Sequence, residues 1–157
     1  MRYLIIIIII INIIAANQNE FNSSKAYNYV IKQCEFGARY PGSEGHKKCK
    51  GFLFNKLLKF CDKAIIDEHT IMDPLTSDSL KIYNIFGRIN PERKNRILLM
   101  AHWDTRRFAD KDINSENHDK PVLGANDGAS GVSVLLTLIE TIYNKNFNNI
   151  GIDITID

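Results

Sequence analysis

The first long feature of the chain is an apolar run from Leu4 to Ile14, which only Asn12 interrupts. One cation, Arg2, precedes the run, and two alanines and a polar stretch follow it. This order is typical of a secretory signal peptide. The run is also shorter than the roughly 20 residues that cross a bilayer as a helix. We therefore expect residues 1–16 to be a signal peptide or a short uncleaved anchor, and the rest of the chain to be secreted or periplasmic.

Beyond residue 16, helical and strand patterns of hydrophobic residues follow one another along the chain. Apolar side chains at helical spacing predict helices over residues 22–35, 43–60 and 128–143. Alternation, or a short continuous apolar run, predicts strands over residues 64–72, 80–89, 96–101 and 150–156. The polar stretches 36–43, 90–95 and 105–121 are predicted to be turns and loops.

The order of the last elements indicates the fold class. The apolar strand 96–101, the helix 128–143 and the strand 150–156 form a crossover unit, which joins parallel strands by a right-handed connection. Helices on both faces of such a sheet make an α/β sandwich. We therefore predict an α/β fold, a three-layer sandwich with a mixed, largely parallel central sheet, formed by residues 17–157.

Composition and charge narrow the classes of function. Hydrophobic residues make up 45% and charged residues 24% of the 157 residues, which is typical of one globular domain. The net charge of +2 is too small for a nucleic-acid-binding protein. The three cysteines (Cys34, Cys49 and Cys61) form no CxxC pair, which argues against a structural zinc knuckle. Cys34 and Cys49 could pair in an oxidising compartment.

The segment after strand 96–101 carries the first candidate site. In open α/β sheets, ligands bind at the carboxyl ends of the strands, and His102 stands there. Asp104 is two positions further on, so its side chain can point the same way and hydrogen-bond the second ring nitrogen of His102. The pair could orient a metal-binding histidine, or it could be a purely structural pair.

The second candidate is the glycine-rich segment Gly124–Gly131 directly before a predicted helix. Its Asp127 could bind a ligand or could cap the helix. A phosphate-binding loop is not favoured, because the segment lacks the Lys-Ser/Thr pair of such loops. Taken together, the His102 imidazole and the Asp127 carboxylate at one sheet edge suit zinc.

These motifs resemble those of the zinc-dependent glutaminyl-peptide cyclotransferases, most closely their bacterial branch, within the clan of zinc aminopeptidases. The resemblance covers roughly residues 30–157. The matching segments are Phe36–Ser43 with His46, Ala101–Arg106, Phe108–Asp110 and Pro121–Val132. It implies the aminopeptidase-like three-layer fold, represented here by an amino-terminal portion.

The resemblance also implies roles for individual residues. Asp127 matches the zinc-binding aspartate, which bridges two zinc ions in the aminopeptidases. His102 matches the histidine that binds a second zinc there and that lines the site in single-zinc cyclases, and Asp104 matches the aspartate that supports it. The acid/base glutamate and the remaining ligands of the family are expected beyond Asp157. We therefore expect this polypeptide to be a fragment of an enzyme, inactive by itself.

Other side chains near the motifs have more than one assignment or lie outside the two motifs. Trp103 and Phe108 could form walls of a substrate pocket or could pack in the core and the loop. Arg106 and Arg107 are predicted to lie in a solvated loop. The histidines without a partner at ligand spacing are predicted to lie on the surface: His46, His69 and His118.

The function implied by the resemblance is glutaminyl-peptide cyclotransferase, which converts an amino-terminal glutamine into pyroglutamate and releases ammonia. One alternative is a secreted zinc aminopeptidase, and another is an inactive remnant that binds peptide amino termini. Zinc is the expected cofactor, and a peptide or protein with a free amino terminus is the expected partner. No nucleic acid is expected, and a membrane only if the amino-terminal segment stays uncleaved.

Overall fold

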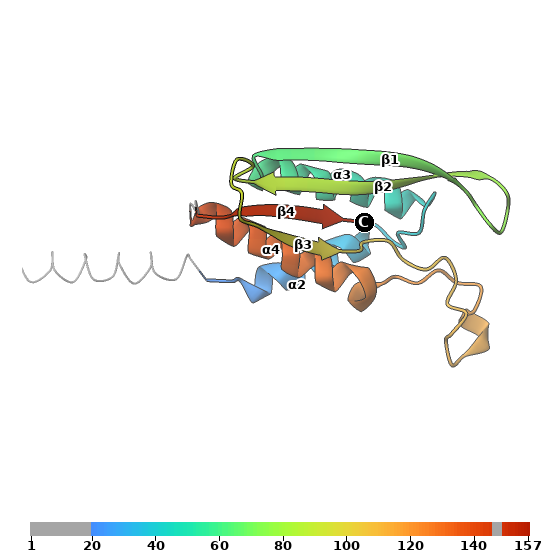
Figure 1. The fold of residues 1–157 in the computed structure, drawn as a ribbon. Helices are drawn as coiled ribbons and strands as arrows, with labels where there is room; N and C mark the ends of the chain where they lie inside the picture. The colour runs from blue at the N-terminus through green and yellow to red at the C-terminus, as the bar shows by residue number, and fades with distance from the viewer. Residues whose placement is uncertain (1–19, 146–148) are drawn as a thin grey trace, which may run out of the picture.

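The structure is a computed structural model that describes residues 20–145 and 149–157 (Figure 1). Its main elements are α2 (Ser23–Glu35), α3 (Glu44–Phe60), β1 (Lys63–Met72), β2 (Ser79–Ile89), β3 (Arg96–Ala101), α4 (Gly131–Asn144) and β4 (Gly151–Ile156). The short turns η1 (Ser115–Asn117) and η2 (Ala125–Ser130) lie between β3 and α4. Each predicted helix and strand is present, with its ends displaced by a few residues at most.

The predicted signal peptide or anchor, residues 1–16, lies outside the described residues. Among the residues that the structure describes, no helix is both long enough and apolar enough to cross a membrane.

The four strands form one sheet in the order β1-β2-β4-β3. β4 pairs in parallel with β3, but β1 with β2 and β2 with β4 pair antiparallel. The prediction of a largely parallel sheet is therefore wrong, although the sheet is mixed as expected. The reason is that only β3 and β4 are joined by a crossover helix. A tight turn from Asp73 to Asp78 joins β1 to β2, and such a connection makes neighbouring strands antiparallel.

The described helices gather on one face of the sheet (Figure 1). Alternate residues of β2 and β4 point to this face and are buried against the apolar stripes of α2, α3 and α4. The shared core includes Leu53, Leu57, Ile85, Leu136, Ile139, Ile152, Ile154 and Ile156. Burial of this face supplies most of the hydrophobic stabilisation of the described part of the chain.

The opposite face of the sheet carries no helix within residues 20–145 and 149–157. The strand register aligns Ile65, Phe86, Thr155 and Met100 in one row across this face. The Ile65 and Met100 side chains at the ends of the row are exposed. The described architecture thus has two layers, and the second helical layer of the predicted sandwich is not seen in it.

The contribution of this core can be measured with one substitution in α3. We expect Leu53→Ala to lower the free energy of unfolding by about 2–5 kcal/mol, because Leu53 is fully buried and the change leaves a cavity. Urea unfolding followed by circular dichroism measures the difference. Leu75→Ala, at an exposed position in the β1–β2 turn, should change it by less than about 0.5 kcal/mol. Equal effects of the two substitutions would contradict the assigned core.

Candidate functional site

The carboxyl ends of β3 and β4 meet at the candidate site, as the crossover pattern predicts. The backbone N–H of Trp103 donates to the Asp157 carbonyl at 2.9 Å, and the N–H of Asp157 donates to the Ala101 carbonyl at 3.2 Å. The parallel pairing therefore extends past the last residues of both strands. This pairing holds the backbone around His102 in an extended conformation at the edge of the sheet.

Two glycines with positive φ allow the segment Gly124–Gly131 to approach the strand end closely. Gly124 has φ +63° and Gly128 has φ +105°, values that favour glycine. A Cβ atom on Gly128 would lie 2.9 Å from the Asp104 carbonyl oxygen and 3.4 Å from Cε1 of His102. The absence of a side chain at Gly128 is thus what permits Asp127 to lie beside the histidine.

The structure brings His102, Asp104 and Asp127 together. Nε2 of His102 lies 3.0 Å from Oδ1 of Asp127, and Nδ1 lies 3.4 Å from Oδ1 of Asp104. The side chains are 51%, 71% and 48% exposed for His102, Asp127 and Asp104, so all three are accessible from solvent. Each ring nitrogen of His102 thus faces one carboxylate: Nε2 faces Asp127, and Nδ1 faces Asp104.

Asp127 does not cap α4, which was the alternative assignment for this residue. The cap position of α4 is Ser130, and α4 begins without a side-chain cap hydrogen bond. The Asp127 carboxylate is directed at an imidazole instead. The local backbone therefore presents Asp127 to the site rather than to the helix.

The donor chemistry of the site suits zinc in part. An imidazole nitrogen and a carboxylate oxygen are typical zinc ligands. A nitrogen and an oxygen 3.0 Å apart are held together either by a proton on Nε2 or by a cation that both coordinate. A catalytic zinc normally has three protein ligands. Among the residues that the structure describes, no group of three or more His, Cys, Asp or Glu side chains could hold a metal ion.

The Trp103 side chain lies in the core, on the opposite side of the extended segment from its neighbours. It is 1% exposed and stacks on His46, with ring centroids 4.3 Å apart and an interplanar angle of 7°. Its indole N–H donates to the Tyr83 carbonyl at 3.3 Å. Trp103 thus anchors the segment to the core, and its ring does not face the open side of the site. Phe108 lies in the following loop and is partly exposed.

The prediction that His46 lies on the surface is wrong, whereas His69 is exposed. His46 is buried because it continues the inward stripe of α3 that includes Cys49, Leu53 and Leu57. Helical spacing alone could have revealed this, but a histidine is more often partly exposed than fully buried. Burial, with a smaller contribution from Lys50, lowers the pKa of His46 to about 4.

The three cysteines are all described, and none of them forms a disulfide. The possible pairing of Cys34 with Cys49 is therefore not seen. Burial raises the pKa of the Cys49 thiol to about 12, so this side chain behaves as a small apolar group of the core.

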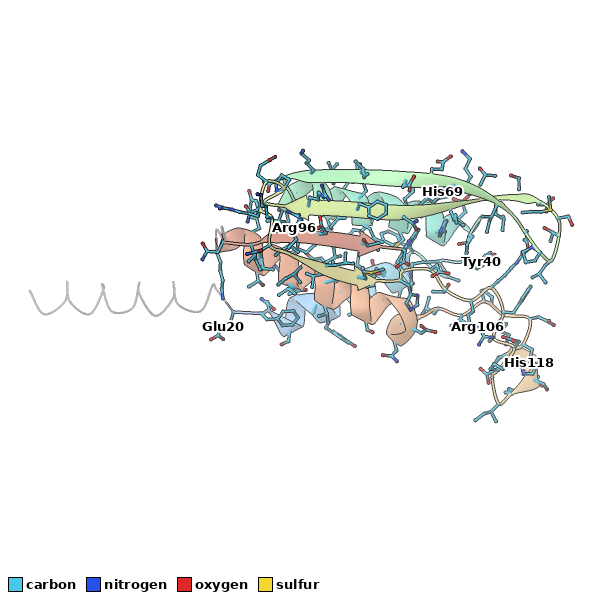
Figure 2. All side chains as sticks on the ribbon, viewed as in Figure 1. Glu20, Tyr40, His69, Arg96, Arg106 and His118 are labelled. Atoms are coloured by element: carbon cyan, nitrogen blue, oxygen red, sulfur yellow. The ribbon has the colours of Figure 1, made fainter. Side chains whose placement is uncertain are left out.

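The long loop after the site is tied to the tip of the β1–β2 hairpin. Nη1 of Arg107 lies 2.6 Å from Oδ2 of Asp73, and the guanidinium also lies over the Tyr40 ring. The Leu75 backbone N–H and Arg107 lower the pKa of Asp73. Figure 2 shows Tyr40, Arg106 and His118 on this side of the molecule, beyond the carboxyl end of β3. Arg107 thus has a structural partner, whereas Arg106 pairs with Asp110 on the exposed loop.

Stability should depend on pH through His46. An unfolded histidine has a pKa of about 6.5, whereas that of folded His46 is about 4. Between these values the unfolded chain binds a proton that the folded chain does not bind, so stability falls as the pH falls through this window. We expect His46→Phe, which keeps a ring over Trp103, to remove up to about 3 kcal/mol of this loss between pH 7 and pH 4. Urea unfolding at several pH values measures it, with the exposed His69→Phe as control. An unchanged pH slope in His46→Phe would contradict the assignment.

The close approach of the two site segments should depend on Gly128. We expect Gly128→Ala to cost about 1–3 kcal/mol, because φ +105° is strained for alanine, and to displace Asp127 from His102. Unfolding and a crystal structure of the variant would show both effects. Gly51→Ala is the control, since nothing lies within 4 Å of its added Cβ. That change, within α3, should instead stabilise the protein by about 0.5–1 kcal/mol. If Asp127 is displaced from His102 in neither variant, Gly128 does not determine how closely the two segments approach.

Comparison with known proteins agrees with the motifs. Residues 84–156 match the model of peptidase family M28. The glutaminyl cyclase of Tannerella forsythia superposes with a TM-score of 0.81 at 40% sequence identity, over 87% of this chain and 46% of that chain. A Zn-dependent exopeptidase from Parabacteroides distasonis superposes with a TM-score of 0.82 at 39% identity, over 87% of this chain and 46% of that one.

A more distant relative is the glutaminyl-peptide cyclotransferase of Bos taurus, 23% identical over 110 residues, or 70% of this chain and 29% of the bovine protein. The chain thus spans less than half the length of these relatives. The resemblance predicted from the motifs is confirmed: over residues 84–156 the chain matches the M28 peptidase family, and its structure is similar to those of bacterial glutaminyl cyclases.

Proposed function

We propose that this chain provides part of the site of a glutaminyl-peptide cyclotransferase, which converts an amino-terminal glutamine into pyroglutamate with release of ammonia. The observation that carries the proposal is the juxtaposition of His102 with Asp127 and Asp104 at the carboxyl end of β3. The similarity to glutaminyl cyclases at about 40% identity supports it. The substrate would be a peptide or protein with a free amino terminus.

In this proposal Asp127 would be a ligand of a zinc ion, and His102 beside it would be a second ligand, as in the aminopeptidases, or would line the site, as in single-zinc cyclases. Zinc in such a site supplies a Lewis acid that polarises the carbonyl group of the substrate. With zinc bound to His102, a hydrogen bond from its Nδ1–H to Asp104 would leave the lone pair of Nε2 for the metal. Trp103 lies between His102 and Asp104 in the sequence, and its side chain is buried in the core. The side chains of His102 and Asp104 therefore lie on the open side of the segment. Phe108 remains a candidate for contact with the substrate.

A second candidate function is hydrolysis of the first peptide bond by a zinc exopeptidase. The structural similarity to a Zn-dependent exopeptidase is as close as that to the cyclase. Both reactions need a free amino terminus and an open site, and the accessible trio serves either. The two reactions differ in their products, which are therefore the decisive readout. The predicted signal peptide would make either protein secreted or periplasmic.

The test is a peptide assay on the protein expressed from its complete reading frame, with zinc supplied. A peptide with amino-terminal glutamine should lose ammonia and keep its length, as mass spectrometry would show. We expect Asp104→Asn to lower the rate about 10- to 100-fold, the usual cost of losing the partner of a metal-binding histidine. Asp127→Asn should lower it further.

The matched control is Asp67→Asn, which removes an exposed carboxylate on β1 that pairs only with His69 among the described ion pairs. It should leave the rate unchanged. Release of free amino acid would favour the exopeptidase over the cyclase. If neither product forms, both enzymatic functions are contradicted. Binding of peptide amino termini is then the remaining role.

A further inference from the structure

One buried cation, Arg39 in the loop between α2 and α3, contacts both segments of the site. Its side chain is fully buried, and it lies at a position to which the sequence patterns assign no role. Its hydrogen bonds run to the carbonyl oxygens of Trp103 (Nε, 3.0 Å), Leu123 (Nη1, 2.9 Å), Gly124 (Nη2, 2.8 Å) and Gln33 (Nη1, 3.3 Å). Its backbone N–H also donates to Oγ1 of Thr105 at 2.8 Å.

These acceptors belong to the two segments that carry the site residues. Trp103 stands between His102 and Asp104, and Gly124 begins the glycine-rich segment that presents Asp127. The packing is tight at this junction. A Cβ atom on Gly124 would lie 2.3 Å from Cγ2 of Thr105 and 3.2 Å from Nη2 of Arg39. The guanidinium thus bridges two segments that are separated by about 20 residues of chain and are not paired as strands.

The charge of Arg39 is compensated in an unusual way. Burying a guanidinium is costly unless its donors are satisfied. Among the described ion pairs none includes Arg39, and all four of its side-chain hydrogen bonds end on backbone carbonyls. The planar fork of arginine directs donors toward several acceptors at fixed angles, which a lysine ammonium cannot reproduce. A role in packing alone would be served by an apolar side chain.

We propose that Arg39 is a positioning residue that fixes the backbone of residues 102–105 relative to residues 123–128, and thereby the separation of His102 from Asp127. Its importance for activity rests on the proposed function, but the positioning itself can be measured without substrate or metal. The fork geometry, rather than the positive charge, is what the proposal requires.

The experiment compares Arg39→Lys with Arg96→Lys by NMR of the isotopically labelled chain at a fixed pH. Arg96 also donates to backbone carbonyls, those of Ile89, Asn90, Arg93 and Ile152, besides its ion pair with Asp153. It lies at the opposite end of the sheet from Tyr40 and Arg106 (Figure 2). It is therefore a matched control for the loss of a multidentate arginine.

We expect Arg39→Lys to shift the amide signals of residues 102–105 and 123–128 and the imidazole nitrogen signals of His102. Arg96→Lys should leave those signals in place even where it lowers the melting temperature by a similar amount. A folded Arg39→Lys with His102 and Asp127 signals at their wild-type positions would overturn the proposal. A general loss of stability, without a selective change at the His102 imidazole, would show a purely structural role.

Thr105→Val keeps the proposal testable if Arg39→Lys does not fold. It removes the acceptor of the Arg39 backbone N–H while preserving side-chain size. We expect smaller shifts of the same signals, and their absence would overturn the proposal. If the variants shift these signals as expected but the peptide assay gives no product, the result counts against the proposed function. The positioning role of Arg39 is then unaffected.

Discussion

The parallel pairing of β3 with β4 is the interaction on which the site depends. It requires α4 to cross over one face of the sheet, and α4 in turn begins where the glycine-rich segment ends. The same connection therefore places the residues after β3 and the residues before α4 at one edge of the sheet. His102 and Asp127 are distant in sequence but adjacent in space because of this pairing, and the contacts of Gly128 and Arg39 then set how closely the two segments approach.

Alternation along the extended segment after β3 then separates structural from chemical roles. Trp103 points into the core, where it stacks on His46 and hydrogen-bonds the Tyr83 carbonyl. His102 and Asp104 consequently point outward and remain accessible. The large buried ring gives the segment a stable anchor, and it keeps the outward side chains in register with each other. The lowered pKa of His46, about 4, is a consequence of the same packing, because burial disfavours the charged form of the imidazole.

Much of this arrangement could be predicted from the sequence, because it depends on local patterns. The helices and strands follow from hydrophobic periodicity, and the neighbourhood of His102, Asp104 and Asp127 follows from the rule on carboxyl ends of strands. The strand order does not follow from such patterns. β4 inserts between β2 and β3 and pairs antiparallel with β2, and in this central place Ile152, Ile154 and Ile156 are buried in the core. Local periodicity carries no information about which neighbour a strand will choose.

Arg39 shows the same limit at the level of one side chain. An arginine in a glycine- and proline-containing loop is expected in solvent, and nothing in its immediate sequence indicates its acceptors. Those acceptors are backbone carbonyls, which every residue possesses, so the side chains around them give no signal of the contact. The close packing at Gly124 and Gly128 is limited in the same way. A glycine in the sequence indicates that another segment can pack closely against it, but does not indicate which segment this is. The parts of the site defined by side-chain identity were accessible from the sequence, whereas the parts defined by backbone contacts required the fold.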